Sequence, residues 1–390
     1  MFTFPSSHKK SVERCCQDDH YLSCTEIKHN FNDFEQIKEM RKMTANGINF
    51  KFYRELPPTG IVFKNEKGDE AVFSFNKKKQ HLFGTINTHD EREFEIERCH
   101  NGHVFKEINV TTLEPRLPIL PETTESLSLE RSTFVEQDNA TIVTYSIMFY
   151  YTQEFAFVTA DIEGFVDHII DITNEGYANS QIPVRVKAFC IEAASLSDTT
   201  GNVYDFRLMK GSSEATLNTA DAAVLLVKYG LGYCGVAFLV PAVKEWVFSV
   251  TAKGCISSFV VGHELGHNFG AHHDIYDAYP GGVYSYGYGH HIERGSFSSG
   301  AQTILAYYRS GYGVRVNYYS NPSVVLPLTG TPTGVEGVSN NAAVITQNRF
   351  TMAANGDESG TCNAPPKKIG ILEVIKIIIV KKLNFLFFWL

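Results

Sequence analysis

The 390-residue sequence lacks several features that mark particular classes of protein. Its formal net charge of -8 is not gathered into long acidic or basic blocks, which argues against a nucleic-acid partner. None of the eight cysteines stands in the Cys-x-x-Cys spacing that is typical of many cysteine-ligated metal sites. What is present is the composition of a folded protein, with 43% hydrophobic and 13% aromatic residues.

A signal peptide is also missing, because the first 25 residues contain no apolar run of about 7 to 15 residues. Three alternatives stay open: the true start is missing from this chain, export uses another route, or the protein stays in the cytosol. Two glycosylation sequons, at Asn109 and Asn139, and the eight cysteines favour a secreted or extracellular location.

Residues 366–390 form a hydrophobic tail, yet Glu373, Lys376 and Lys381 interrupt it. Since a bilayer requires about 20 mostly apolar residues, a spanning helix is not expected. The tail either lies on a membrane surface with its lysines at the interface or is non-native or disordered, and the second alternative is favoured.

The first part of the chain, residues 1–130, is predicted to be a small β-rich region. Short alternating stretches between residues 48 and 108 are separated by Gly, Asn, Asp and Lys clusters, a pattern typical of strands and turns. Residues 111–132 then carry three prolines among Thr, Ser and Glu, which indicates a linker. A domain boundary is placed there.

A second domain, residues 133–360, is predicted to be α/β with a mixed, helix-backed sheet. A strand is expected within residues 141–151, a one-faced helix from residue 162 to 170, and strands at residues 184–190 and 222–227. The run 222–227 is apolar throughout, as in a strand covered on both faces. Beyond residue 275, loops and a closing helix near residues 342–353 are expected.

The clearest chemical signal is a histidine cluster in residues 263–273, which read HELGHNFGAHH. His263 and His267 are four residues apart on a predicted helix, so both imidazoles face the same way. The helix is expected to end at Gly270, which lets the chain reverse and brings His273 round as a third ligand. Three neutral nitrogens with an open fourth position are typical of a catalytic Zn²⁺ site.

Glu264 is the predicted general base, because it lies beside the ligands and can take a proton from water held by the metal. In the plainer alternative these are ordinary helix histidines, a reading that is reasonable for the two-histidine motif alone. The added Gly270 and His273 favour the metal site. His272 is interpreted as a loop histidine, and Asp274 either fixes that loop or orients an imidazole.

With the aspartate that follows it, the motif HELGHNFGAHHD resembles the active site of the metzincin zinc metallopeptidases, and specifically their reprolysin or adamalysin branch. Similarity extends over residues 133–360, including the stretches LNTADAAVLLVKYGLGYCGVAFL, FSVTAKGCISS and TILAYYRSGYGVRVNYYSNPSV. Residues 81–108 are similar, more weakly, to the end of a propeptide in that group. The resemblance implies a removable prodomain over residues 1–130 and a zinc endopeptidase that acts on proteins or peptides.

Several residue roles follow from the resemblance. Leu305 stands where the family has the methionine of its methionine turn, a change that similar volumes should allow. Tyr307 lies two residues later, where some metzincins place a tyrosine that can stabilise an oxyanion, although the adamalysin branch does not rely on it, and Tyr307 can instead be a packing residue. In this family cysteines at the positions of Cys234 and Cys255 are paired, whereas the spacing alone also allows two independent thiols.

The other cysteines leave alternatives open. Cys99 lies near the end of the propeptide-like region, where its thiolate can bind the zinc and keep a precursor latent. The competing interpretation places Cys99 in a disulfide. Cys190 is expected to be a small buried hydrophobic residue on a strand.

Two further functions compete with a peptidase. One is a pseudoprotease that keeps the zinc site as a folding element and acts as a binding module, although an intact Glu264 argues against it. The other is a zinc-dependent toxin component, for which the sequence names no target.

Overall fold

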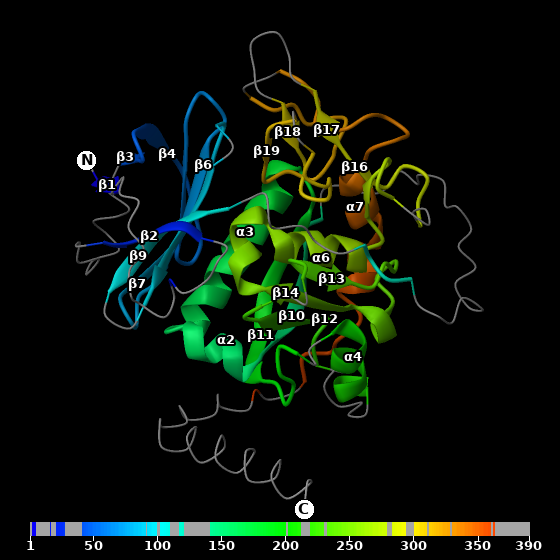
Figure 1. The fold of residues 1–390 in the computed structure, drawn as a ribbon. Helices are drawn as coiled ribbons and strands as arrows, with labels where there is room; N and C mark the ends of the chain where they lie inside the picture. The colour runs from blue at the N-terminus through cyan, green and yellow to red at the C-terminus, as the bar shows by residue number, and fades with distance from the viewer. Residues whose placement is uncertain are drawn as a thin grey trace, which may run out of the picture.

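Two β-sheets and the helix between them organise the protein in the computed structural model (Figure 1). Helix α3 (Ile162–Asn179) packs against strands of the N-terminal sheet on one side and against a strand of the second sheet on the other. The structure describes residues 2–4, 16, 21–27, 41–90, 92–99, 102–109, 117–120, 141–199, 202–211, 219–229, 232–278, 283–293, 300–309, 312–327, 330–359 and 362.

The N-terminal sheet has nine strands in the order β1-β3-β4-β5-β6-β7-β8-β9-β2. From β3 to β9 each strand pairs antiparallel with the next, which agrees with the alternating stretches and turn residues of the sequence. Its strands are β1 (Phe2–Phe4), β2 (Tyr21–Ile27), β3 (Lys42–Ala45), β4 (Ile48–Leu56), β5 (Gly60–Lys64), β6 (Glu70–Asn76), β7 (His81–Thr88), β8 (Arg92–Arg98) and β9 (His103–Ile108). The sequence did not predict β1 and β2.

The second sheet has five strands in the order β11-β10-β12-β14-β13, in which only β13 runs antiparallel to its neighbour. The predicted mixed, helix-backed sheet is confirmed. Strand β12 is buried along its whole length, as its unbroken apolar sequence indicates. The strands are β10 (Val143–Tyr151), β11 (Val184–Ala193), β12 (Ala222–Val227), β13 (Gly235–Ala237) and β14 (Phe248–Ala252).

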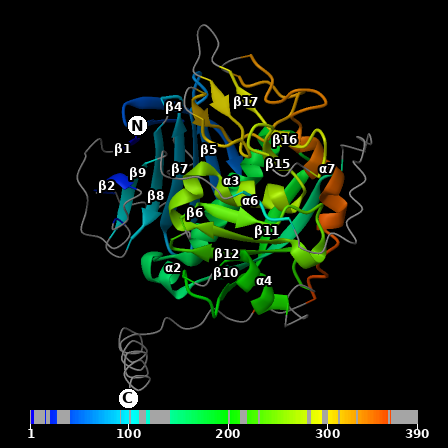
Figure 2. The same ribbon diagram turned by 45° about the vertical axis from the view of Figure 1, so that its right-hand side comes forward.

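Helices cover this sheet (Figure 2). Helix α3 begins where the Asp161 side chain accepts a hydrogen bond from the backbone of Gly164, a standard N-cap, and its apolar positions recur at helical spacing. The sequence did not predict α2 and α4. The remaining helices are α2 (Gln153–Val158), α4 (Val203–Gly211), the 3₁₀ segments η3 (Lys244–Trp246) and η4 (Lys253–Ser258), α6 (Val260–Asn268) and α7 (Asn341–Met352).

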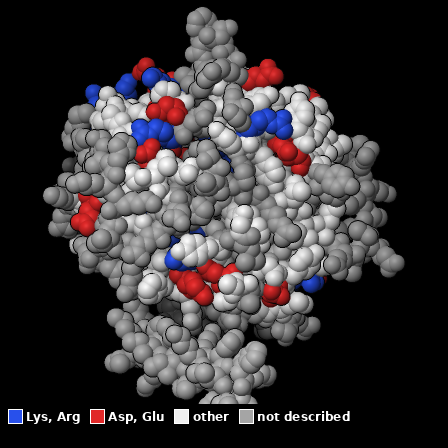
Figure 3. Space-filling view, viewed as in Figure 1, with Lys and Arg blue, Asp and Glu red and all other residues white. Residues whose placement is uncertain are grey.

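Beyond residue 275 the described chain is mostly irregular, as predicted, until α7 closes it. Short strands organise this region and the residues just before it. They are β15 (His272–Asp274), β16 (Tyr288–Gly289), β17 (His291–Ile292), β18 (Ala301–Gln302) and β19 (Val314–Arg315). On the face shown in Figure 3, acidic and basic side chains of the described residues lie in small groups between uncharged areas.

The largest hydrophobic core is shared by both sheets. Val62, Val72 and Phe83 of the N-terminal sheet belong to the same buried cluster as Phe165 of α3 and the strands of the second sheet. Neighbouring residues such as Ile61 point the other way, into a separate core that the N-terminal sheet forms by itself. Because side chains alternate along a strand, strands β6 and β7, which contact α3, are buried on both faces.

The disulfides correct two expectations for the cysteines. The pairing of Cys234 with Cys255 is present, as the resemblance implied. Cys190, however, is bonded to Cys362 rather than being a free buried thiol, because a partner 172 residues away cannot be read from spacing. Cys16 pairs with Cys24.

Cys99 is buried and disulfide-bonded. The predicted thiolate switch, in which Cys99 would bind the metal, is therefore wrong for this structure, since a sulfur in a disulfide has no thiolate to offer. The competing interpretation of Cys99 as a disulfide cysteine is the one that the structure supports.

No helix of the described residues is long and apolar enough to cross a membrane. The hydrophobic tail at residues 366–390 lies outside the described residues.

Candidate metal centre

Helix α6 positions the first two histidines. It runs from Val260 to Asn268 and is buried throughout, with His263 and His267 one turn apart. The helix is tied to the second sheet, because the backbone N–H of Val240 donates to the carbonyl of His267 at 3.1 Å, and the Asn268 side chain donates to the carbonyl of Phe238 at 3.0 Å. Helix α6 is thus fixed to the chain that continues from β13, the edge strand of the second sheet.

The chain reverses directly after α6 and returns the third histidine to the helix. Gly270 has φ +94, in the left-handed region that favours glycine. The N–H groups of Gly270 and Ala271 cap the carbonyls of His267 and Gly266. This reversal places His273 on β15, beside the two helix histidines.

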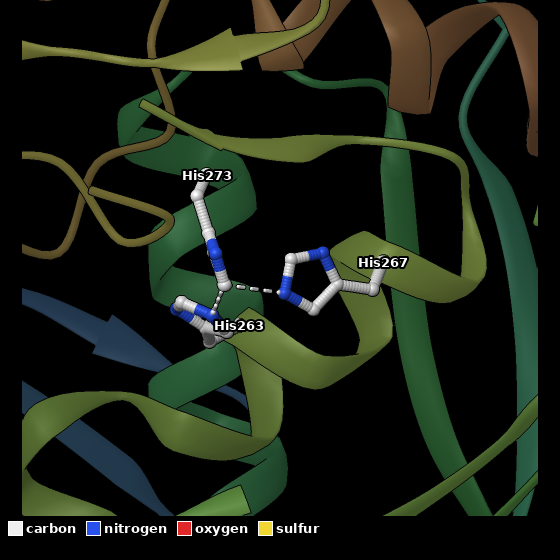
Figure 4. Close-up of side chains that lie close together, drawn as sticks. All are labelled: His263, His267 and His273. Carbon is white, nitrogen blue, oxygen red and sulfur yellow. Dashed lines mark hydrogen bonds between the residues drawn. The ribbon is translucent and has the colours of Figure 1, made fainter. Parts of the chain in front are cut away.

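The three imidazole rings point at one another (Figure 4). Nε2 of His273 lies 3.0 Å from Nε2 of His263 and 3.0 Å from Nε2 of His267. All three side chains are fully buried. Among the described residues, this is the one group of three His, Cys, Asp or Glu side chains close enough to hold a metal ion.

Backbone carbonyls fix the tautomers of the helix histidines. Nδ1 of His263 donates to the carbonyl oxygen of Ile304, and Nδ1 of His267 donates to that of Ala271, both at 2.8 Å. A carbonyl only accepts, so each Nδ1 carries the proton and each Nε2 presents a lone pair. Burial lowers the pKa of His267 to about 3, and burial together with neighbouring imidazoles lowers the pKa of His263 and His273 well below 6.5.

This arrangement fits a metal ion. Hydrogen bonds alone explain the contacts poorly, because His273 has a single Nε2 hydrogen at most to share between two lone pairs. In a tetrahedral site with zinc–nitrogen bonds of about 2.0–2.1 Å, ligand nitrogens lie about 3.3 Å apart, close to the separations found here.

Glu264 lies next to this cluster and is fully buried. Neither carboxylate oxygen has a hydrogen-bond partner within the described part of the chain, and burial raises its pKa well above the usual value. The carboxylate contacts Gly235 of β13 so closely that a Cβ there would collide with it. A buried carboxylate without a partner is costly, which is typical of a group held for a ligand or for catalysis.

A turn at residues 303–307 lies beneath the histidines. Its Ile304 carbonyl holds His263, and Leu305 is fully buried against the helix at Gly266, where an added Cβ would lie 2.9 Å from Leu305 Cδ1. The leucine therefore occupies a packing position under the metal helix. Its predicted structural role agrees with this placement.

Tyr307 is brought to the third histidine. Its ring lies 4.0 Å from the ring of His273, centroid to centroid, and is tilted by 39°. The Tyr307 N–H donates to Asp274 Oδ2 at 3.2 Å, and its carbonyl accepts from Nε2 of His291 at 2.8 Å. The proximity agrees with either predicted role, catalytic or packing.

Asp274 accepts hydrogen bonds from backbone N–H groups, and its Oδ1 lies 3.8 Å from Nδ1 of His291. Besides Tyr307, its carboxylate accepts from the N–H of Tyr276 at 3.1 Å, so it fixes the two loops around the site. His272, expected in a loop, lies buried in β15, and its Nδ1 accepts the N–H of His273 at 2.7 Å. It therefore orients the third histidine through the backbone.

Sequence reasoning missed three residues around the site. They are Gly235, which makes room for Glu264, His291, which holds the turn at Tyr307, and Arg315, which donates from Nη2 to the carbonyl of Ala306 at 3.0 Å. None belongs to the histidine motif. A glycine at the start of a strand is too common a signal to have identified Gly235.

An additional peptide segment pairs with the edge of the second sheet at β13, which lies beside helix α6. Ile119, in the described segment 117–120, donates its N–H to the carbonyl of Ala237 at 2.9 Å and accepts from the N–H of Leu239 at 2.9 Å. It pairs parallel to the chain at Phe238. The segment thus occupies backbone groups of the edge that lies next to the metal cluster.

Comparison with known proteins agrees with this site. Residues 143–320 match the sequence model of Metallo-peptidase family M12. A "Peptidyl-Asp metalloendopeptidase" of Stenotrophomonas maltophilia is 27% identical over 204 residues, covering 50% of this chain and 48% of that protein. A relative of the same name from Xanthomonas campestris is 23% identical over 204 residues, covering 50% and 47%. The chain spans about half the length of these curated relatives.

Among solved structures, the crystal structure of metalloproteinase-II from Bacteroides fragilis aligns with a TM-score of 0.40 and 11% identity, covering 74% of this chain and 90% of that one.

Proposed function

We propose that this chain, which carries a metzincin-like metallopeptidase domain over residues 143–320, is a zinc-dependent endopeptidase that hydrolyses internal peptide bonds. The observation that carries the proposal is the pairing of two features. Three histidines aim their Nε2 atoms at one point, and a buried carboxylate without a described partner lies beside them. The family implies a metal, and the all-nitrogen ligand set is suited to zinc.

Each residue has a part in the proposed reaction. His263, His267 and His273 hold the ion, which would polarise the scissile carbonyl and acidify a water molecule. Glu264 takes the proton from that water at a carboxylate oxygen and delivers it to the leaving amine. The burial of Glu264 excludes bulk water from this proton transfer.

A zinc-binding pseudoprotease is the competing function. Its histidine cluster would look the same, but it would have no use for an unpartnered carboxylate. Burying Glu264 costs free energy without any compensating contact in the described chain. That cost favours a catalytic site over a binding module.

The deciding experiment uses the full chain and a peptide library, with the cut sites read by mass spectrometry. We expect cleavage that stops when a chelator removes the metal and returns when zinc is added. Glu264→Ala should keep one metal per chain by elemental analysis while losing peptidase activity by several orders of magnitude. A Glu264→Ala protein that cleaves as fast as the parent would rule out the assigned base.

Substrate preference can be proposed from the relatives, whose names specify aspartyl peptides. We propose that an acidic side chain beside the cut bond is also favoured here, with Arg315 as the cation that attracts it. Arg315 is 7% exposed, and its charge helps lower the pKa of His263 and His273, so it lies close to the metal cluster. Arg315→Gln should reduce the preference for Asp over Asn peptides, whereas Arg309→Gln, at a partly exposed arginine that pairs with Asp277, should not.

Latency is proposed to come from the segment at residues 117–120. An extended substrate that pairs with the edge at β13 would need the carbonyl of Ala237 and the N–H of Leu239, both of which Ile119 uses. Occupation of these groups explains a latent precursor without a cysteine ligand.

A secreted or extracellular location is part of the proposal. Every cysteine that the structure describes is disulfide-bonded. Such usage is typical of oxidising compartments.

A further inference from the structure

We propose that the N-terminal sheet stays bound to the metallopeptidase unit after the chain between them is cut, so that the working enzyme is a complex of two fragments. The binding surface on the peptidase unit is made by α3 and η4, and its partner is the sheet of β1 to β9. This inference goes beyond the proposed function, because it holds whether or not the site cleaves peptides.

Apolar packing is the first support. The ring of Phe83 on β7 packs edge-on against Phe165 of α3, with centroids 6.3 Å apart, and stacks on His168 at 6.4 Å. Val62 and Val72 belong to the same core and are at most 2% exposed. Separation would expose these side chains on one fragment and the face of α3 on the other, which water disfavours.

Ion pairs cross the same surface at the start of α3. Asp161, whose side chain is fully buried, accepts from Lys79 Nζ at 2.7 Å and from His81 Nδ1 at 2.9 Å. Lys79 also reaches Glu163 at 2.9 Å. Asp161 is the N-cap of α3, so the sheet supplies the charges that compensate a buried helix cap.

A second ionic group joins the other end of α3 to the sheet. Glu175, also fully buried, pairs with Arg54 and, at 3.3 Å, with Lys64, both from the N-terminal sheet. Without the sheet, α3 would lose its cationic partners at both ends. Breaking a buried pair by removing one partner is strongly destabilising.

Between these ends a neutral network is shared by the two units. His168 of α3 is buried, with Nδ1 2.9 Å from the Ser74 hydroxyl and Nε2 2.8 Å from the Thr85 hydroxyl. A neutral imidazole can donate at one nitrogen and accept at the other, so both strand hydroxyls satisfy it. Each fragment alone would leave these buried polar groups without their partners.

The sheet also contacts η4, the segment that precedes helix α6. Lys253 of η4 is buried and pairs with Glu97 of β8 at 2.5 Å. Asn87 of the sheet donates to the carbonyl of Ser257 at 3.0 Å, and Ser257 donates to Glu95. The sheet therefore supports the segment that leads into α6.

These contacts are separate from residues 117–120, the blocking segment that pairs with the edge of the second sheet. Ile119 bonds to the chain at Ala237 and Leu239, whereas the docking surface is on α3 and η4. Removal of the blocking segment and release of the sheet are thus different events. The blocking segment can therefore leave the edge while the sheet stays in place.

The test inserts a recognition sequence for a site-specific protease between residues 120 and 141 of the full chain. After complete cutting, size-exclusion chromatography in native buffer should give one peak that contains both fragments, and denaturant should separate them. Two peaks in native buffer, with the fragments shown to be intact, would overturn the proposal.

Charge reversals locate the surface. Lys79→Glu puts a third carboxylate beside Asp161 and Glu163, and should weaken fragment association about tenfold or more. Lys51→Glu is the matched control, because Lys51 pairs with Glu66 inside the same sheet and is exposed. Arg54→Glu, which faces Glu175, is the second test variant if the first folds poorly. Equal effects of the Lys79 and Lys51 reversals would contradict the assigned surface.

Discussion

Leu305 packs directly under the metal helix at Gly266. An added Cβ at Gly266 would lie 2.9 Å from Cδ1 and 3.2 Å from Cδ2 of Leu305, so the turn and the helix touch without space between them. The residue before the leucine, Ile304, holds His263 through its carbonyl. Packing and ligand orientation are thus coupled in one turn.

Truncating this side chain should destabilise the site. Leu305→Ala is expected to cost about 2–5 kcal/mol of unfolding free energy, and Leu305→Met less than about 1.5 kcal/mol, because volume is kept. Thermal unfolding of both variants, with metal content measured in parallel, checks the expectation. A Leu305→Ala protein as stable as Leu305→Met would show that the leucine is not a packing residue.

The blocking segment gives a prediction for latency. Ile119→Pro removes the N–H that donates to the carbonyl of Ala237, so the segment should leave the edge more often. The uncut chain should then show about a tenfold higher kcat/KM on a peptide substrate, from the loss of one backbone bond and its pairing. Leu117→Ala, at a position 44% exposed, is the control and should change little.

A buried acid predicts how stability depends on pH. Burial raises the pKa of Asp171 to about 8, a hydrogen bond from Ser74 acts against this, and nearby Asp167 and Glu175 add to it. The pKa is higher in the folded state than in the unfolded state, so this group stabilises the fold at low pH and the contribution is lost as pH rises from about 4 through about 8. His168, which also contacts Ser74, has its pKa lowered by burial to about 3, and acts in the opposite direction below about pH 6.5.

Asp171→Asn mimics the protonated acid at every pH. The melting temperature of the variant minus that of the parent should therefore increase between pH 5 and pH 8, since only the parent loses stability through this group. Thermal melts of the full chain at several pH values provide the measurement. A constant difference across that range would mean that Asp171 is already ionised in the folded protein.

The histidine cluster could be predicted from the sequence because its three members lie close together along the chain. A four-residue helical spacing and one glycine turn determine the placement of His263, His267 and His273. Strands of the second sheet could also be predicted from the sequence, since an apolar run such as residues 222–227 predicts a buried strand by itself.

Long-range pairings could not be read in the same way. Cys190 and Cys362 are joined across 172 residues, and Asp161 meets Lys79 across 82 residues. Spacing contains no information on such partners. The core that the two sheets share could not be predicted from the sequence either. Val62 lies in an apolar strand, and its sequence pattern is the same whichever face of the sheet it lies on.

Tyr307 provides the last prediction, which separates catalysis from packing. Its ring lies against His273, so its phenol could donate to the oxyanion that forms when water adds to the carbonyl. Loss of such a donor typically costs about 100-fold to 1000-fold in turnover. If Tyr307 has this role, Tyr307→Phe should lower kcat by that factor and leave KM nearly unchanged, because the ring still packs on the histidine.

The packing alternative predicts a different outcome. Asp274 and His291 hold the backbone of Tyr307, not its phenol, so the loop should keep its shape in the variant. Tyr307→Phe would then retain turnover, whereas Tyr307→Ala would lower stability and metal content. Kinetics of both variants, in protein shown to be folded and zinc-loaded, distinguish the two. Undiminished kcat in Tyr307→Phe would assign the tyrosine to packing, because a donor to the transition state cannot be removed without a loss of rate.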